Sequence, residues 1–464
     1  MVQQLIDTPR PIADRPPAQR VGQARMAPQA AIPAVVQLII CATFLPETLS
    51  FYVAELRLTV VRVIFLALAP VLLVRLGLKV SDGRYRFVPS DLLVTLAGVW
   101  MFLGPAMVDG IGAAMKHSGP VVLEFCIAYW SMRLLLSARG QARSAVSLLC
   151  GVIAIVALLG LLDPLTNRYL IHDWGAALTG YVKPNSRFVY RLGFLRASGP
   201  LEHSILYGFT CSIGILMAMT VRMRARILKI SACVVGAVFS FSSAPIQAVF
   251  IGSGLLLYNR ILARVPGRWF ALIVLVSCGF TALFLLVDAP LGIIVRHLIF
   301  DPGSGYDRLL QWNVAGSGLL RTSPWFGMGF DPLPPAIRDR LITGSIDSLW
   351  LMSALTYGIP GSALIGLSLI STTIPFTRGP GINLTPAESH LGTGLSILMF
   401  IVMFVGFTVD LWGIDWILVA LLMGIRAHLG ELGRIAQPVG YRLATGRIAG
   451  QGAPAMRQSS VGGL

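Results

Sequence analysis

A polar interval at residues 305–361 carries the side chains best suited to chemistry in an otherwise apolar chain. Arg308 offers a planar guanidinium that can bind a phosphate through two parallel hydrogen bonds. Trp312 follows it, and Asp347 stands at the start of a long apolar run. A carboxylate in that place can take a proton from a substrate hydroxyl, or it can cap the following helix, and both roles stay open. These residue types predict a site that binds a phosphate and accepts a proton.

Arginine is also the dominant cation of two long segments, about 164–203 and about 288–346. A concentration of guanidinium groups suits the binding of a lipid-linked phosphate or pyrophosphate. The alternative is that these side chains pair with nearby aspartates. The candidates for phosphate binding besides Arg308 are Arg187, Arg191 and Arg196.

Two other residues are candidates because of their places in apolar runs. Glu124 lies about five residues from one end of the run 119–137, and ionisable groups inside membrane spans are commonly functional. It is the second candidate base, and the alternative is a structural ion pair with an arginine of another helix. His203 precedes the run 204–221 and is a candidate for substrate binding. The sequence contains neither an HExxH nor a DxD motif, so we expect no metal and no other cofactor.

The composition indicates that the elements positioning these residues are membrane helices. Of 464 residues, 55% are hydrophobic and only 12% are charged, and the mean hydropathy is +0.75, whereas soluble domains carry about 25% charged residues. A helix needs about 20 apolar residues to cross a bilayer. The apolar runs predict an all-α protein with twelve spans, at 31–46, 58–75, 91–108, 119–137, 144–163, 204–221, 228–243, 245–259, 269–287, 347–376, 391–408 and 410–426.

The basic residues orient these spans. If both termini are cytoplasmic, the inner segments hold most of the 37 lysines and arginines, as the positive-inside rule requires. The net charge of +16 then reflects the basic residues on the cytoplasmic side of the membrane, and we expect no nucleic-acid partner. We predict one membrane domain at 31–430, with outer loops at about 164–203 and 288–346, between disordered cytoplasmic tails at 1–30 and 431–464.

Two of the apolar runs contain a predicted break. Pro245, in Ser242-Ser243-Ala244-Pro245, divides a run that is too long for one helix. Gly358-Ile-Pro-Gly361 interrupts the run 347–376 in the same way. Broken helices at membrane depth usually line cavities or binding sites.

In their order and spacing, these features resemble the O-antigen ligase and polysaccharide polymerase family of bacterial inner membranes. The resemblance covers roughly 190–425 and rests on Arg196-x-x-Gly199, Ser242-Ser243-x-Pro245, Arg308, Trp312, Pro324-x-x-Gly327-x-Gly329, Asp347 and Gly358-Ile-Pro-Gly361. It implies a GT-C-like glycosyltransferase of the inner membrane, active on the periplasmic face. The implied substrates are a glycan donor on undecaprenyl pyrophosphate and a glycan acceptor, in contact with membrane lipids and with a chain-length regulator as a further partner.

The resemblance also implies roles for single residues. Arg308 and Arg196, helped by Arg191 and Arg187, would hold the pyrophosphate in place of a metal. Asp347, or Glu124, would activate the acceptor hydroxyl. The side chains expected to contact the sugars are His203, Tyr306, Trp312 and Trp325.

Departures from the family pattern favour a polymerase of repeat units. Asp347-Ser348 stands where ligase-type members have His-Asn, and Thr356 stands where they have an acidic residue. An O-antigen ligase, which transfers the glycan to lipid A–core or to protein, is the first alternative. A secondary transporter or glycolipid flippase is the second, because twelve spans and broken helices fit it too, although transporters are usually built from internal repeats and we find none in the sequence.

Overall fold

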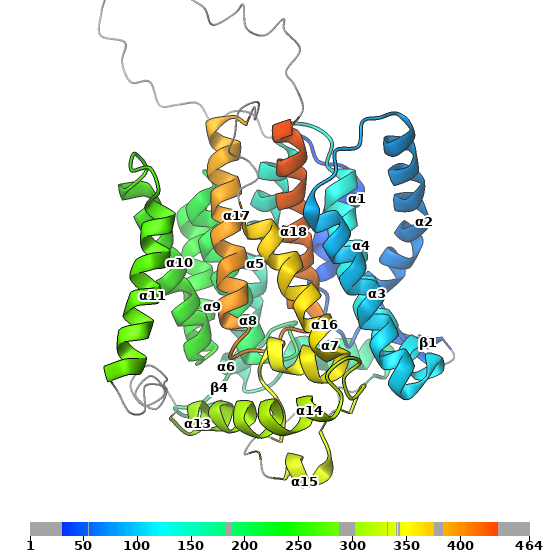
Figure 1. The fold of residues 1–464 in the computed structure, drawn as a ribbon. Helices are drawn as coiled ribbons and strands as arrows, with labels where there is room; N and C mark the ends of the chain where they lie inside the picture. The colour runs from blue at the N-terminus through cyan, green and yellow to red at the C-terminus, as the bar shows by residue number, and fades with distance from the viewer. Residues whose placement is uncertain are drawn as a thin grey trace, which may run out of the picture.

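The computed structural model describes residues 30–53, 55–181, 188–286, 302–331, 333–339, 341, 344–374 and 384–434. These residues form a bundle of α-helices (Figure 1). Its long helices are α1 (Ala34–Thr43), α2 (Val60–Ser81), α3 (Pro89–Asp109), α4 (Ile111–Leu135), α5 (Gln141–Gly160), α8 (Ser204–Thr220), α9 (Arg226–Phe239), α10 (Ser243–Ile261), α11 (Arg268–Leu286), α16 (Leu349–Thr373), α17 (Pro386–Val405) and α18 (Gly413–Arg434). The predicted tail at 1–30 lies outside the described residues except for Ala30.

Each of the twelve predicted runs contains a helix, so the all-α class is confirmed. Six helical stretches in the described part of the chain are long and apolar enough to cross a membrane, namely α2, α3, α5 with its continuation α6 (Leu162–Thr166), α16, α17 and α18. The sequence predicts twelve complete spans, which is more than the six candidates found among the described residues. With 10 residues in α1 and 14 in α9, and a rise of about 1.5 Å per residue, these helices are shorter than a hydrocarbon core of about 30 Å.

The shorter elements gather at one end of the bundle. Figure 1 shows β1 and the short helices at the end opposite to the one where α17 begins and α18 ends. These elements are α7 (Leu170–Thr179), α13 (Pro302–Gln311), the π-helical η1 (Trp312–Leu319), α14 (Leu320–Thr322) and α15 (Pro335–Arg338). They belong to the two long loops that the sequence analysis places on the outer side.

Two small hairpins at this end were not predicted. β1 (Ser50–Val53) pairs antiparallel with β2 (Leu56–Thr59), and β3 (Tyr190–Arg191) pairs with β4 (Phe194–Leu195). The second hairpin turns through Leu192 and Gly193, which both have positive φ, as a tight two-residue turn requires. Asn or Asp usually stands where this chain has Leu192, and for that reason the turn was not visible in the sequence.

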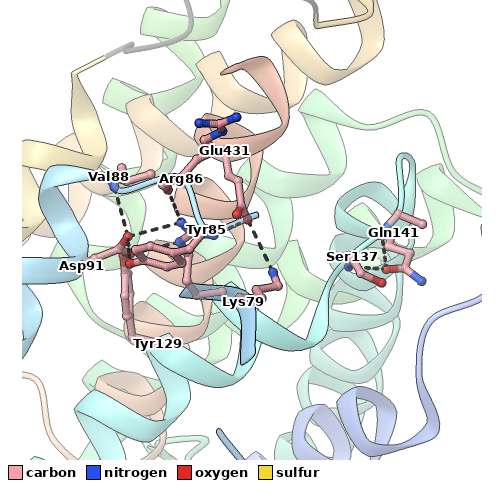
Figure 2. Close-up of polar contacts among 11 residues, drawn as sticks. Lys79, Tyr85, Arg86, Val88, Asp91, Tyr129, Ser137, Gln141 and Glu431 are labelled. Atoms are coloured by element: carbon pink, nitrogen blue, oxygen red, sulfur yellow. Dashed lines mark hydrogen bonds and ion pairs between the residues drawn. The ribbon is translucent and has the colours of Figure 1, made fainter. Parts of the chain in front are cut away.

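The buried helix α18 is tied to its neighbours by an ion network at the opposite end (Figure 2). Arg133 of α4 is fully buried and pairs with both Asp91 of α3, at 3.0 Å, and Glu431 of α18. Lys79 of α2 reaches Glu431 at 3.7 Å, and the Tyr129 hydroxyl donates to Asp91 at 2.6 Å. These contacts explain why α18 continues to Arg434, so that residues 431–434 are helical rather than part of the predicted tail.

The predicted break in α16 is confirmed. Gly358 has φ 77° and ψ 169° inside the helix, and the Pro324-x-x-Gly327-x-Gly329 turn packs against this point. The Ile359 N–H donates to the Pro324 carbonyl at 2.8 Å, and the Met328 N–H donates to the Leu355 carbonyl at 2.6 Å. The turn therefore supplies hydrogen-bond partners that the interrupted helix cannot supply itself.

Replacing Gly358 with alanine is expected to lower the free energy of unfolding by at least about 1–3 kcal/mol. Its backbone conformation is one that only glycine adopts easily, and an added Cβ would lie 2.0 Å from the Trp325 carbonyl oxygen. Thermal unfolding of the detergent-purified protein measures the effect. Gly366→Ala, in the same helix, is the control because its Cβ would meet nothing closer than 3.4 Å. Equal melting temperatures of the two variants would contradict this account of the break.

Candidate functional site

A cavity of about 560 Å³ is lined by residues that include Tyr52 of β1 and Tyr181, which follows α7. Figure 1 shows the end of the bundle where β1 and α7 lie. The wall of the cavity comes from the β1–β2 hairpin, the first turns of α2 and α4, both sides of the break in α16, and the segment before α18. The volume is typical of ligand sites. Its charged or titratable side chains are Glu55, Arg57, Arg62, Lys116, His117 and Asp410, and its aromatic side chains are Tyr52, Tyr181, Phe330, Tyr357, Trp412 and Trp416.

Arg62 is held in the wall by a carboxylate from another helix. Its Nε lies 2.7 Å from Glu124 Oε1, and its Nη1 donates to the Arg57 carbonyl at 3.0 Å. Thr59 caps α2 by accepting the Arg62 N–H, which fixes where this arginine enters the helix. Glu124 therefore forms an ion pair with an arginine of another helix. This is the structural alternative that the sequence left open for Glu124.

Arg57 is held in a similar way by Glu47 and Tyr181. Its Nη2 lies 2.8 Å from Glu47 Oε2, and its Nη1 donates to the Tyr181 hydroxyl at 2.8 Å. The guanidinium carbon also lies 5.2 Å from the centre of the Tyr181 ring, within the range of a cation–π interaction. Burial disfavours the charged form, but the carboxylate of Glu47 outweighs this and raises the pKa of Arg57. Arg57 therefore keeps its positive charge at any physiological pH.

Asp410 is the acid of the cavity whose titration falls near neutrality. Burial raises the pKa of Asp410 to about 7, and the charge of Asp347 adds to this, while a hydrogen bond from the Leu411 N–H at 2.9 Å opposes it. A carboxyl group that titrates near the operating pH is suited to general base catalysis.

Arg308 and Asp347, selected from the sequence, lie on two segments that a hydrogen bond to Gln311 joins. Burial raises the pKa of Asp347, and the charge of Arg308 partly offsets the rise. Gln311 accepts the Asp347 N–H at 2.9 Å, which joins α13 to the start of α16. The cap of α16 is Ser348, whose hydroxyl accepts the Leu351 N–H at 3.4 Å. The capping role considered for Asp347 is therefore wrong, because the following serine fills it.

The aromatic residues selected from the sequence lie elsewhere on this end of the molecule. The Trp312 indole donates to the Phe407 carbonyl at 3.3 Å and stacks on the Phe407 ring. Tyr306 and Trp325 are more than half exposed. Among described residues, the lining of the cavity includes none of these three, and other aromatic side chains take their place there.

Arg191 and Arg196 serve the predicted break between α9 and α10, which the structure confirms. The Arg196 Nε donates to the Ser240 carbonyl at 2.9 Å, and Arg191 Nη1 donates to the Phe241 carbonyl at 2.8 Å. Cations stabilise the carbonyl end of a helix, so both arginines secure the end of α9. Burial, with the charge of Arg191, lowers the pKa of Arg196 to about 10. In the part of the chain that is described, neither lines the cavity; Arg187 lies outside that part.

His203 lies at the start of α8, next to an aromatic residue of the cavity wall. Its Nδ1 accepts the Ile205 N–H at 3.2 Å and so caps α8. Its ring centre is 6.3 Å from that of Trp412, which belongs to the cavity wall. The residue thus touches the site through an aromatic neighbour.

The sequence analysis missed Arg57, Arg62 and Asp410. Arg62 could have been found from the sequence, because it is an ionisable residue inside the outer part of the apolar run 58–75. Glu124 was selected for the same reason. No protein-family model matches this chain, and no curated protein is significantly similar to it in sequence.

Proposed function

We propose that this chain is a membrane glycosyltransferase that polymerises oligosaccharide repeat units carried on undecaprenyl pyrophosphate. The observation that carries the proposal is the composition of the cavity wall. Guanidinium groups, aromatic rings and an acid with a pKa of about 7 surround one space of about 560 Å³. A lipid-linked sugar pyrophosphate needs each of these three kinds of group.

The cations of the wall suit the pyrophosphate. Arg57 and Arg62 are oriented by Glu47 and Glu124, two carboxylates that are not part of the described lining. Their fixed positive charge would stabilise the negative charge that develops on the leaving group. Lys116, which pairs with the exposed Glu55, adds a third cation to the wall.

Asp410 is the proposed base of the reaction. The acceptor hydroxyl attacks the anomeric carbon of the donor while its proton passes to the Asp410 carboxylate. The bond from the anomeric carbon to the pyrophosphate oxygen breaks, and its electron pair leaves with the pyrophosphate. The charge of Arg308 acts on Asp347, and that of Asp347 acts on Asp410, so the two residues are proposed to set the affinity of Asp410 for the proton.

The aromatic side chains offer flat faces for sugar rings. Tyr52, Tyr181 and Trp412 come from three separate segments of the cavity wall, so they could contact successive sugars of a repeat unit. The hydroxyl groups of Tyr52 and Tyr181 can also hydrogen bond to a sugar hydroxyl.

The proposed orientation places this end in the periplasm of a bacterial inner membrane, with twelve spans and both termini in the cytoplasm. It follows from the basic residues at the other end of the bundle. Lys79 and Arg133 lie there with the end of α18, and the positive-inside rule assigns such an end to the cytoplasm.

Deletion of the gene, followed by analysis of the lipid carrier, tests the proposal. A polymerase mutant is expected to accumulate single repeat units on undecaprenyl pyrophosphate, because repeat units are made but not joined. Accumulation of long polymer on the carrier would indicate a ligase instead. Movement of the lipid-linked glycan across proteoliposomes, without formation of a glycosidic bond, would indicate the transporter or flippase.

A further inference from the structure

Two carboxyl groups from distant parts of the chain meet behind the cavity wall. Glu47 lies between α1 and β1, and Glu202 lies just before α8. Both reach the backbone of Gly413, where an added Cβ would stand 2.8 Å from Glu202 Oε1 and 3.2 Å from Glu47 Oε1. The φ of Gly413 is 57°, so the position suits glycine for its backbone as well as for space. The two carboxyl groups therefore pack against the same glycine and are close neighbours.

Each member of the pair also holds one group of the wall. Glu47 Oε2 lies 2.8 Å from Arg57 Nη2, and the Trp412 indole donates to Glu202 Oε2 at 2.7 Å. Arg57 and Trp412 both line the cavity. The pair therefore stands between a cation of the wall and an aromatic ring of the wall, and holds each of them by one hydrogen bond.

A hydrogen bond between two carboxyl groups needs a proton on one of them, because two carboxylates offer only acceptors. Burial opposes ionisation of Glu47, but its contacts with Glu202 and Arg57 outweigh this and lower the pKa of Glu47. The guanidinium of Arg57 favours the negative charge on Glu47, whereas Glu202 contacts the neutral indole of Trp412, so the proton belongs on Glu202. In that state Glu202 donates to Glu47 with one oxygen and accepts the Trp412 N–H with the other.

We propose that Glu47 and Glu202 share one proton and act as a positioning pair, which fixes the Arg57 guanidinium and the Trp412 ring relative to each other. The role of the pair in catalysis rests on the proposed function. In that function, the pair sets the distance between the pyrophosphate and a sugar of the bound donor. Neither residue need touch the reacting atoms.

The arrangement depends on pH in a defined direction. Loss of the shared proton leaves two carboxylates in contact, so the link is intact at low pH and weakens as pH rises. The charged or titratable groups that face the pair are Arg57 of β2, Arg62 of α2, Glu124 of α4 and His203 beside Trp412. Of these, the two arginines favour the carboxylate of Glu47 and Glu124 opposes it.

Fluorescence of Trp412 tests the pair without any substrate. The emission of this residue is obtained by subtracting the spectrum of full-length Trp412→Phe from that of the wild type, both in nanodiscs, across a pH series. We expect the emission to change with pH in the wild type, because a neighbouring carboxyl group gains or loses a proton. Glu202→Gln keeps both hydrogen bonds but cannot titrate, so the change should disappear while His203 is retained. An unchanged titration in Glu202→Gln would overturn the proposal.

Kinetics with a lipid-linked donor give a second readout. Glu202→Ala is expected to raise the KM for the donor about 10-fold, which corresponds to one lost positioning interaction of about 1.4 kcal/mol, with a smaller change in kcat. Glu202→Gln should restore most of the KM. An equal defect in both variants would overturn the shared proton. Absence of transfer by the wild type would count against the proposed function, and the fluorescence titration would still decide about the pair.

Discussion

Replacing Asp410 with asparagine is expected to lower the kcat of glycosyl transfer by about 10²–10⁴-fold, the usual contribution of a general base. Asparagine keeps the size of the side chain and accepts the Leu411 N–H as the aspartate does, but it cannot take a proton from the acceptor. The KM for the donor should change little, because Arg57 and Arg62 remain. Transfer is measured with purified protein in nanodiscs, a lipid-linked donor and chromatography of the glycan products.

The rate of transfer is expected to depend on pH in a direction that the base determines. A base works as the carboxylate, and the pKa of Asp410 is raised to about 7 by burial and by the charge of Asp347. Activity of the wild type should therefore rise as pH increases through about 7. The residual activity of Asp410→Asn should lack this rise.

Two matched variants separate the base from other acids. Asp415→Asn, five positions further along, replaces the carboxyl group of a fully buried aspartate that accepts the Thr210 hydroxyl, and it should retain transfer. Glu124→Gln tests the other base considered from the sequence, and it should lose far less kcat than Asp410→Asn because an amide oxygen still accepts from Arg62. Full activity of Asp410→Asn, or inactivity of Glu124→Gln alone, would assign the base to another residue.

Replacing Arg133 with alanine is expected to lower the free energy of unfolding by about 3–5 kcal/mol, as found when one partner of a buried ion pair is removed. The side chain is fully buried, and the exposed fractions of Asp91 and Glu431 are only 2% and 5%. The variant would leave both carboxylates without their shared cation. Thermal unfolding in detergent, followed by circular dichroism, measures the loss.

Arg139→Ala is the control for this prediction. Arg139 pairs with Glu388 at 3.3 Å, but 37% of its side chain is exposed, and exposed ion pairs contribute about 0–1 kcal/mol. The two variants remove the same kind of side chain from the same end of the bundle. A loss in Arg133→Ala no larger than in Arg139→Ala would show that the buried network does not stabilise the fold.

The helices and their breaks could be predicted because they depend on local sequence. Each predicted apolar run contains a helix of the described part of the chain, and Pro245 and Gly358 marked two interruptions, since proline and glycine act on the backbone where they stand. The hairpin at Leu192 could not be predicted in this way. Its turn lacks the usual residues, and the end of α9 secures it through Arg191 and Arg196.

Residues of the candidate site could be predicted only where they lie close together along the chain or belong to a recognised motif. Arg308 and Asp347 were selected, and a hydrogen bond to Gln311 joins their two segments. Arg62 and Asp410 were not, because their importance comes from contacts across the bundle. Arg62 meets Glu124, which is 62 residues away, and no spacing rule relates two helices that pack side by side. The same limit applies to Glu47 and Glu202, which are neighbours only in the folded protein.

The central place of α18 has a consequence for biogenesis. This helix is synthesised after every other helix that the structure describes, yet it is almost entirely buried among them. Until it emerges from the ribosome, Arg133 lacks Glu431 and the facing surface of α4 has no helix to pack against. Helices inserted earlier must therefore wait in the membrane as an incomplete bundle, and a chain truncated before residue 413 should be a substrate for membrane proteases rather than a partly active protein.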